Sequence, residues 1–233
     1  MKRQFDPAVL EMMDRPQSRS LDLERDLENL RQLNHWFGSY RLVLAFMRRW
    51  IRPGDQVRIA DLATGSADIP RRIIDYARSI GATVEIDALD RQSATLDVAR
   101  ALSVNYPEIS FLEADILEWQ PDNRYDIVLN SLALHHFSDE DAIRLLCRCR
   151  ELSSRFVLVS DLRREFLAKA GVYLLTAVIF REPMTRFDAR ISAARSFSFS
   201  EMKDLASRAG WKEFGHEKFR FALQAVWLEK IDN

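Results

Sequence analysis

Residues 57–70, VRIADLATGSADIP, have the layout of a buried strand, a tight turn and the start of a helix. Such a turn often surrounds a nucleotide cofactor, because its backbone N–H groups and the helix N-terminus favour an anion such as a ligand carboxylate. Gly65 can let the chain come close to a ligand, whereas Ala63 and Ala67 stand where two more glycines are usual. With one glycine, the loop alone is equally consistent with an ordinary strand-to-helix corner.

Three aspartates at the ends of successive strand-like segments give this loop its context. Asp61 could orient the loop or accept from a ligand ammonium. An acid about 20 residues after a glycine loop can hold a pair of ribose hydroxyls, and Asp90 stands slightly further on. Asp115 could accept from an adenine amine, with Ile116 beside it to pack on the ring. One acid at a strand end is commonly a turn cap, but three in succession favour a nucleoside site.

His135 and His136 follow the fourth strand-like segment. An imidazole can take a proton near neutral pH, so a general base is one interpretation. The alternative is that a histidine packs at the junction, where Ser138 starts the next helix. We expect His136 to be the packed partner and leave both roles open for His135. The two histidines lack neighbouring ligands at useful spacing, so we expect no metal site.

The elements that must position these residues alternate along the chain. Short runs rich in β-branched and apolar residues predict strands at 57–62, 83–89, 109–112, 125–129 and 156–160. Helical patterns fill the gaps, which predicts an α/β fold, a Rossmann-like and mostly parallel sheet with helices on both faces. Residues 211–216 and 219–228 follow without a helix between them. They predict a hairpin that closes the sheet with an antiparallel strand.

Two segments depart from this alternation. Residues 1–52 have apolar side chains at helical spacing and predict a helical N-terminal cap. Residues 53–233 form the main domain, with an insertion at about 161–197 that we expect to act as a lid over the carboxyl edge of the sheet. The apolar stretch 166–180 is shorter than the roughly 20 residues that span a bilayer, so it predicts a helix in a cleft wall or lid.

The composition limits the classes of partner. The 233 residues suffice for one sizeable core. A net charge of −1 gives no broad attraction for phosphate backbones, so we expect a small-molecule partner and no nucleic acid. The first 16 residues lack the continuous apolar region of a secretory signal, which predicts a cytoplasmic protein without stable membrane insertion. The oligomeric state cannot be read from the sequence.

The segments VRIADLATGSADIP, IDALD, EADI and YDIVLNSLALHHF, followed by the closing hairpin, resemble the class I S-adenosylmethionine-dependent methyltransferases. The resemblance runs from about Gln56 to the C-terminus and is strongest to small-molecule methyltransferases with a helical N-terminal cap. It implies S-adenosylmethionine as the cofactor and methyl transfer to a small acceptor. The acceptor group that we expect by analogy is a hydroxyl of an aromatic or polyketide-like metabolite.

The resemblance also implies roles for individual residues. The acid that ends the first strand and the glycine turn hold the methionine part of the cofactor, the acid after the second strand binds the ribose, and the acid after the third reaches the adenine. The end of the fourth strand approaches the methionine part and the acceptor. The cofactor-binding residues are then Asp61, Ala63, Thr64, Gly65, Asp90, Arg91, Asp115, Ile116, Asn130 and Ser131. His135 is the candidate catalytic residue.

The sequence departs from the family pattern at Ala63, where the family nearly always has glycine, and more mildly at Ala67. Ala63 motivates a second hypothesis, a catalytically silent S-adenosylmethionine-binding protein with a regulatory role. The retained acids argue against it. A nicotinamide-dependent oxidoreductase would share the first strand–helix–strand unit but predicts neither the closing hairpin nor an acid after the third strand.

Overall fold

The computed structural model describes residues 2–9, 11–12, 15, 18–165 and 183–230. The apolar stretch 166–180, expected as a helix in a cleft wall or lid, lies outside the described residues. The strands are β1 (Gln56–Leu62), β2 (Thr83–Asp90), β3 (Ile109–Glu113), β4 (Tyr125–Ser131), β5 (Ser153–Leu162), β6 (Gly215–Phe219) and β7 (Leu223–Glu229). The helices are α1 (Leu21–Trp36), α2 (Ser39–Trp50), α3 (Asp68–Ile80), α4 (Ser93–Leu102), α5 (Asp139–Leu152), α7 (Pro183–Arg195), α8 (Phe199–Arg208) and the short 3-10 helix η1 (Leu134–His136).

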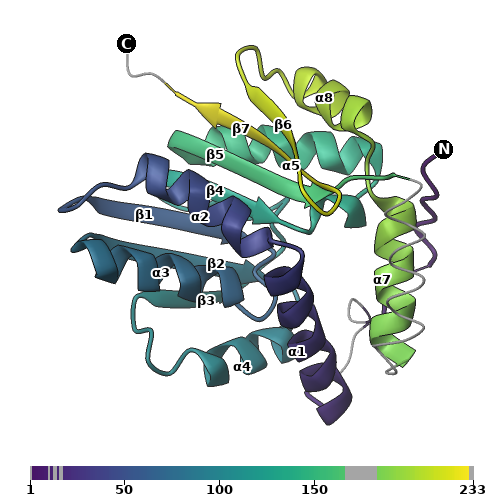
Figure 1. Ribbon diagram of the computed structural model, residues 1–233, viewed down its shortest axis with the longest axis horizontal. Helices are drawn as coiled ribbons and strands as arrows, with labels where there is room; N and C mark the ends of the chain where they lie inside the picture. The colour runs from purple at the N-terminus through teal and green to yellow at the C-terminus, as the bar shows by residue number, and fades with distance from the viewer. Residues whose placement is uncertain (1, 10, 13–14, 16–17, 166–182, 231–233) are drawn as a thin grey trace.

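One sheet of seven strands runs through the described residues in the order β3-β2-β1-β4-β5-β7-β6 (Figure 1). The strands β1 to β5 are parallel, and β7 is antiparallel to both β5 and β6. The strand order reverses between β1 and β4, which is where open α/β sheets bind ligands. The predicted Rossmann-like sheet with a closing antiparallel strand is confirmed.

Helices cover both faces of the sheet. Apolar residues of α2 and α3, such as Phe46 and Ile73, form one core with one face of the sheet. Those of α5 and α8, such as Leu145 and Leu205, form a second core with the opposite face. Because β1, β4 and β5 are covered on both faces, each contains an unbroken run of buried residues, at 59–62, 127–130 and 157–161, rather than an alternation. The sheet is thereby a rigid support for the residues that follow its strands.

Local sequence signals set several helix boundaries. The helix α8 begins with the expected capping box, in which Ser198 and Glu201 each bond the other's backbone N–H group. The helix α3 ends at Gly81, whose φ of 70° is readily adopted only by glycine. Pro70 is tolerated in α3 because it lies in the first turn.

The closing hairpin begins later than the sequence pattern indicates. We expected its first strand at 211–216, but β6 starts at Gly215. Trp211 lies in the core instead, and its indole N–H donates to the carbonyl oxygen of Leu146 at 3.1 Å. The apolar residues before Gly215 therefore anchor the chain against α5 rather than pairing with a strand.

The carboxyl ends of the parallel strands face α1, α7 and the N-terminal segment (residues 2–9, 11 and 12), which lie at one end of the sheet in Figure 1. Arg3 ties this segment down: its Nε donates to the carbonyl oxygen of Arg195 at 2.6 Å, and its Nη2 donates to those of His135 at 3.1 Å and Phe137 at 2.6 Å. The predicted cap thus contains two helices preceded by an irregular segment that crosses the sheet edge.

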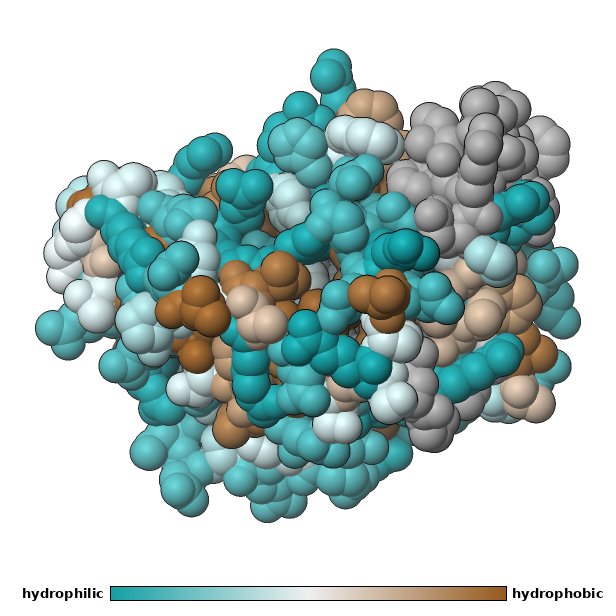
Figure 2. Space-filling view, turned by 90° about the horizontal axis from the view of Figure 1, so that it is seen from below, coloured by the Kyte–Doolittle hydropathy of each residue, from teal (hydrophilic) through white to brown (hydrophobic). Residues whose placement is uncertain are grey.

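The face seen from below in Figure 2 has apolar side chains in small groups among hydrophilic ones. Large apolar side chains that are exposed include Leu21, Leu102 and Val104. Among the described residues, no helix combines the length and apolar character needed to cross a bilayer.

Candidate active site

A cavity of about 990 Å³ opens at the carboxyl edge of the sheet, between the strand ends, α1, α7 and the N-terminal segment. Nine of the ten expected cofactor-binding residues line it: Asp61, Ala63, Thr64, Gly65, Asp90, Arg91, Asp115, Ile116 and Ser131. His135 lines the same cavity. The structure therefore brings together residues that the sequence places on four different strand ends.

The loop after β1 holds two alanines in the left-handed region, Ala63 with φ of 61° and Ala67 with φ of 54°. These are the positions where the family pattern has glycine, and the backbone keeps the glycine-like conformation with alanine in place. Gly65 has φ of 56°, and a Cβ built on it meets no protein atom within 4 Å. The loop thus opens toward the cavity at Gly65, where a bound molecule can lie against the backbone.

Side chains and backbone groups fix this loop to the strand ends. The Thr64 hydroxyl donates to Asp61 Oδ2 at 2.6 Å, and the Thr64 backbone N–H donates to the carbonyl oxygen of Leu89 at 2.7 Å. The Gly65 backbone N–H donates to Asp90 Oδ2 at 3.0 Å. The hydrogen bonds to Leu89 and Asp90 therefore hold the loop against the end of β2.

Asp61 is the penultimate residue of β1 and is only 3% exposed. Burial raises the pKa of its carboxyl to about 7; the Thr64 hydrogen bond opposes this shift, and the negative charges of Asp68 and Asp90 add to it. A cationic group in the cavity would favour the ionised carboxylate. Asp61 is thus suited to the ammonium of an amino-acid moiety.

Asp90 and Asp115 differ in how they are held. Asp90 is half-buried and accepts from two backbone N–H groups, those of Gly65 and Gln92, both at 3.0 Å. Asp115 is exposed and accepts from the backbone N–H of Leu117 at 2.9 Å. Its neighbour Ile116 is buried and contributes apolar surface to the cavity wall. Asp90 is the more firmly positioned of the two carboxylates.

Asn130 is the one expected cofactor-binding residue that is not among those lining the cavity. It is fully buried beneath the strand ends, and its Nδ2 donates to the carbonyl oxygen of Leu62 at 2.8 Å. Its neighbour Ser131 does line the cavity, and the Ser131 and Ser160 hydroxyl oxygens lie 2.9 Å apart. In this structure Asn130 links β4 to β1, and Ser131 faces the cavity.

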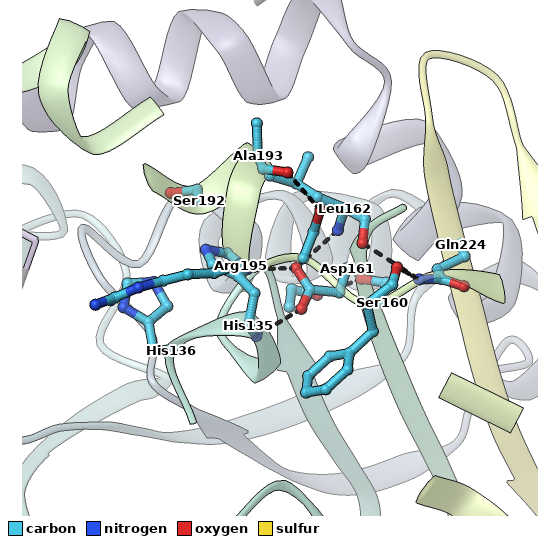
Figure 3. A network of polar contacts seen from close by, with 12 residues as sticks. His135, His136, Ser160, Asp161, Leu162, Ser192, Ala193, Arg195 and Gln224 are labelled. Carbon is cyan, nitrogen blue, oxygen red and sulfur yellow. Dashed lines mark hydrogen bonds and ion pairs between the residues drawn. The ribbon is translucent and has the colours of Figure 1, made fainter. Parts of the chain in front are cut away.

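His135 is held by Asp161, a fully buried residue near the end of β5 (Figure 3). Asp161 accepts from His135 twice, with Oδ2 2.8 Å from the backbone nitrogen and Oδ1 2.6 Å from Nδ1. Asp161 Oδ1 also accepts from the backbone N–H of Leu162 at 2.7 Å. A carboxylate beside Nδ1 places the ring proton there, which leaves the lone pair of Nε2 available to act as a base.

Glu11, from the N-terminal segment, lies beside both histidines. Its Oε1 is 3.9 Å from His135 Nε2, and its Oε2 is 3.9 Å from His136 Nε2. Glu11 is 2% exposed and accepts from the Ser192 hydroxyl at 2.9 Å. The expectation that the histidines lack neighbouring ligands does not hold, because Glu11 comes from a distant part of the sequence. His136 is half-buried and its ring lies 4.4 Å from that of His135.

Sequence reasoning did not identify Asp161 or Glu11. Asp161 carries the same signal as the other acids, a carboxylate near the carboxyl end of a parallel strand, and could have been found by extending that argument to β5. Glu11 has no comparable signal, because it lies in an irregular segment whose position depends on contacts with α7 and η1.

Comparison with known families identifies the domain. Residues 59–155, which run from β1 into β5, match the family profile described as a methyltransferase domain. This part of the chain is thus similar to a methyltransferase domain. A search of curated protein sequences gives no match.

Solved structures that resemble this methyltransferase domain share its fold at low sequence identity. Human N-acetylserotonin methyltransferase in complex with S-adenosylmethionine superposes with a TM-score of 0.64 and 16% identity over 89% of this chain and 55% of that one. The plantazolicin methyltransferase BpumL, bound to a substrate analogue and S-adenosylhomocysteine, has a TM-score of 0.59 and 14% identity over 88% of this chain and 84% of that one. A Nostoc punctiforme protein provisionally described as an O-methyltransferase has a TM-score of 0.63 and 16% identity over 89% of this chain, which spans 60% of its length.

These comparisons confirm the predicted class I methyltransferase fold, and the cofactor of that class is S-adenosylmethionine. The residues present here fit that molecule. Carboxylates stand at the ends of β1, β2 and β3 for its cationic and hydroxyl-bearing parts, and Gly65 leaves open space beside the backbone. Ile116 and Arg91 add an apolar and a basic side chain at the same end of the cavity.

Proposed function

We propose that the protein transfers a methyl group from S-adenosylmethionine to a hydroxyl of a small, largely apolar acceptor, such as an aromatic or polyketide-like metabolite. The observation that carries the proposal is a single cavity lined both by the strand-end acids and by His135. Its volume of about 990 Å³ lies at the upper end of the range of about 300–1,000 Å³ found for ligand sites. The cavity therefore has room for an acceptor beside the cofactor.

The apolar side chains of the cavity wall support an apolar acceptor. Leu30 and Leu33 lie on α1, Phe37 and Phe137 directly follow α1 and η1, and Phe5 comes from the N-terminal segment. Bound S-adenosylmethionine would supply an electrophilic methyl group, which would pass in line to the acceptor oxygen with S-adenosylhomocysteine as the leaving group. The chain's contribution is to hold the acceptor in that line and to exclude water.

His135 acts as the general base in this proposal. Its Nε2 takes the proton of the acceptor hydroxyl, while Asp161 holds the Nδ1 proton and stabilises the imidazolium that forms. Asn130 and Ser131, at the end of β4, remain proposed neighbours of the methionine part of the cofactor. Ser131 would contact it directly, whereas Asn130 would act indirectly, by holding the end of β4 against β1. The retained acids and the ordered loop give the silent-protein hypothesis no support from this site.

Cofactor choice is tested by calorimetric titration with S-adenosylmethionine, S-adenosylhomocysteine and NAD. We expect the first two to bind and NAD not to bind, and binding of NAD alone would refute the proposal. The variant Gly65→Val should lose affinity for S-adenosylhomocysteine by more than about 100-fold, because its side chain fills the space where the backbone meets the ligand.

Gly81→Val is the matched control for that variant. Gly81 has φ of +70° and, like Gly65, no atom within 4 Å of a built Cβ, but it does not line the cavity. Both substitutions therefore carry a similar backbone strain. Equal loss of affinity in the two variants would show that instability, rather than the blocked space, is responsible. Turnover is then measured as release of S-adenosylhomocysteine with a panel of phenolic acceptors, and absence of turnover on all of them would favour the silent protein.

A further inference from the structure

Glu11, His135 and His136 form a compact cluster of metal-ligand side chains on the cavity wall. One donor atom from each residue lies within 4.8 Å of the others. Glu11 and His135 are buried, and His136 is half-buried. Imidazole nitrogens and a carboxylate are ligands shared by Zn²⁺ and related transition-metal ions.

The arrangement around the cluster is that of a supported ligand set. Asp161 Oδ1 lies 2.6 Å from His135 Nδ1 and accepts a hydrogen bond from it (Figure 3). The other ring nitrogen, Nε2, lies 3.9 Å from Glu11 Oε1. Histidines that bind metals commonly donate their second ring N–H to a carboxylate in this way. The Ser192 hydroxyl orients Glu11 from α7 by donating to Oε1 at 2.9 Å.

Charge also favours a cation here. Glu11 and Asp161 are both almost fully buried and carry two negative charges when ionised, and the imidazoles are neutral when they act as ligands. Arg3 is paired with Asp139 at 2.8 Å, whereas Arg195 donates to backbone carbonyl oxygens and keeps its positive charge near the cluster. One positive charge beside two ionised carboxylates leaves a net negative charge, which favours a cation.

We propose that Glu11, His135 and His136 bind one divalent transition-metal cation, with Zn²⁺ as the best match to the ligand set. Donors about 2.1 Å from one ion at the tetrahedral angle lie about 3.4 Å apart. The two separations from Glu11 are 3.9 Å, so side-chain adjustments of about half an ångström suffice for these pairs. Mg²⁺ and Ca²⁺ prefer all-oxygen sites and fit less well. Three protein ligands leave a position open toward the cavity.

This site has a consequence that rests on the proposed function. A cation on His135 Nε2 occupies the lone pair that takes the acceptor proton. Zn²⁺ is therefore expected to inhibit methyl transfer, with relief by a chelator. Metal binding itself needs neither cofactor nor acceptor and can be measured separately.

The test uses the full chain, freed of metal with a chelator and then dialysed. Zn²⁺ is titrated by calorimetry, and Co²⁺ is titrated while visible absorption is recorded. We expect one ion per chain, and weakening of Zn²⁺ binding by more than tenfold in Glu11→Gln and in His136→Ala. Asp161→Asn, which keeps all three ligands, should weaken binding by about 10–100-fold. His35→Ala is the matched control, because His35 is exposed and lies outside the cavity lining.

The proposal is overturned if the wild-type chain binds no ion with this stoichiometry. It is also overturned if binding is unchanged in Glu11→Gln and His136→Ala, or if His35→Ala loses it. Thermal unfolding of each variant shows whether the fold is retained, and Glu11→Gln keeps an oxygen for the Ser192 bond. Failure of methyl transfer with intact Zn²⁺ binding would refute the proposed function and leave the metal site standing.

Discussion

The two ends of the cavity are built differently. The cofactor end comes from one stretch of chain, residues 61–116, in which three neighbouring parallel strands each end in or precede an acid. The acceptor end is assembled from Glu11, His135, Asp161 and Ser192, which lie on four separate segments. The first end is ordered mainly by strand register, and the second by side chains that meet only after α7 and the N-terminal segment have packed.

This difference predicts separable functions. Parallel register fixes where strand ends lie, so the cofactor end depends little on the rest of the chain. The acceptor end depends on contacts between distant segments and can be disturbed without harm to cofactor binding. Substitutions at the cofactor end should therefore change the affinity for S-adenosylhomocysteine, and those at the acceptor end should change turnover.

The largest effect is expected from His135→Ala. Loss of a positioned general base typically reduces the rate by about 10²–10⁴-fold, so turnover should fall within that range while the affinity for S-adenosylhomocysteine stays within about twofold. Asp161→Asn should reduce turnover less, because the imidazole remains but its orientation and charge support weaken. Near-normal turnover in His135→Ala, measured at saturating acceptor, would show that His135 is not the general base.

A smaller effect, confined to the cofactor end, should distinguish Asp90 from Asp115. A carboxylate that holds two ribose hydroxyls makes charge-assisted bonds worth about 1.5–3 kcal/mol each before compensation by water. Asp90→Ala also removes an acceptor of the Gly65 N–H, so it should weaken S-adenosylhomocysteine binding more than Asp115→Ala does. Calorimetry on both variants measures this order, and equal or reversed losses would show that the assigned roles are wrong.

The free energy of unfolding should depend on pH because the buried Asp61 carboxyl has a raised pKa. Its folded pKa of about 7 exceeds the unfolded value of about 3.9, so the protonated carboxyl stabilises the fold at low pH and this contribution disappears as the pH rises through 7. Between pH 5 and 7 the loss is about 2–3 kcal/mol, at about 1.4 kcal/mol per pH unit. The difference in unfolding free energy between the wild type and Asp61→Asn should change by that amount. A constant difference across this range would contradict the raised pKa.

The smallest effect is expected from Ala63→Gly. The left-handed conformation costs a non-glycine residue about 1–2 kcal/mol, and glycine regains part of this while adding about 0.4–1 kcal/mol of unfolded-state entropy. The net change in unfolding free energy should lie between zero and about 1 kcal/mol of stabilisation. Ala60→Gly, in the middle of β1, is the control and should destabilise the protein. Destabilisation of equal size in both variants would mean that Ala63 is not strained.

The sequence was sufficient to predict the sheet and to identify residues that the fold gathers around one cavity; their roles toward a cofactor remain predictions. Strand periodicity and the acids at 61, 90 and 115 depend on local pattern, and the structure places all three around one cavity. The predicted strand start at 211 was wrong, because an apolar residue that anchors a loop, as Trp211 does, has the same local pattern as one in a strand. Asn130 was expected in the cavity because of its strand-end position, but its side chain bonds to β1.

The acceptor end was less accessible to sequence reasoning. His135 was identified as a candidate base, but nothing in its neighbourhood along the chain indicates Asp161 or Glu11. Their positions follow from the pairing of β4 with β5 and from the anchoring of the N-terminal segment by Arg3. Contacts of this kind depend on tertiary packing, which local periodicity does not encode. The domain limits expected at 52 and 161–197 remain predictions.

Arg3 holds the N-terminal segment through backbone carbonyl groups of His135, Phe137 and Arg195. A backbone carbonyl is the same whichever side chain its residue carries, so this anchorage tolerates sequence change around it. Substitutions at cavity-lining positions such as Pro7 and Ala189 therefore leave the acceptors of these three hydrogen bonds unchanged. The acceptor pocket of this scaffold can be reshaped, by natural drift or by directed evolution, while the strand ends that serve the cofactor stay constant.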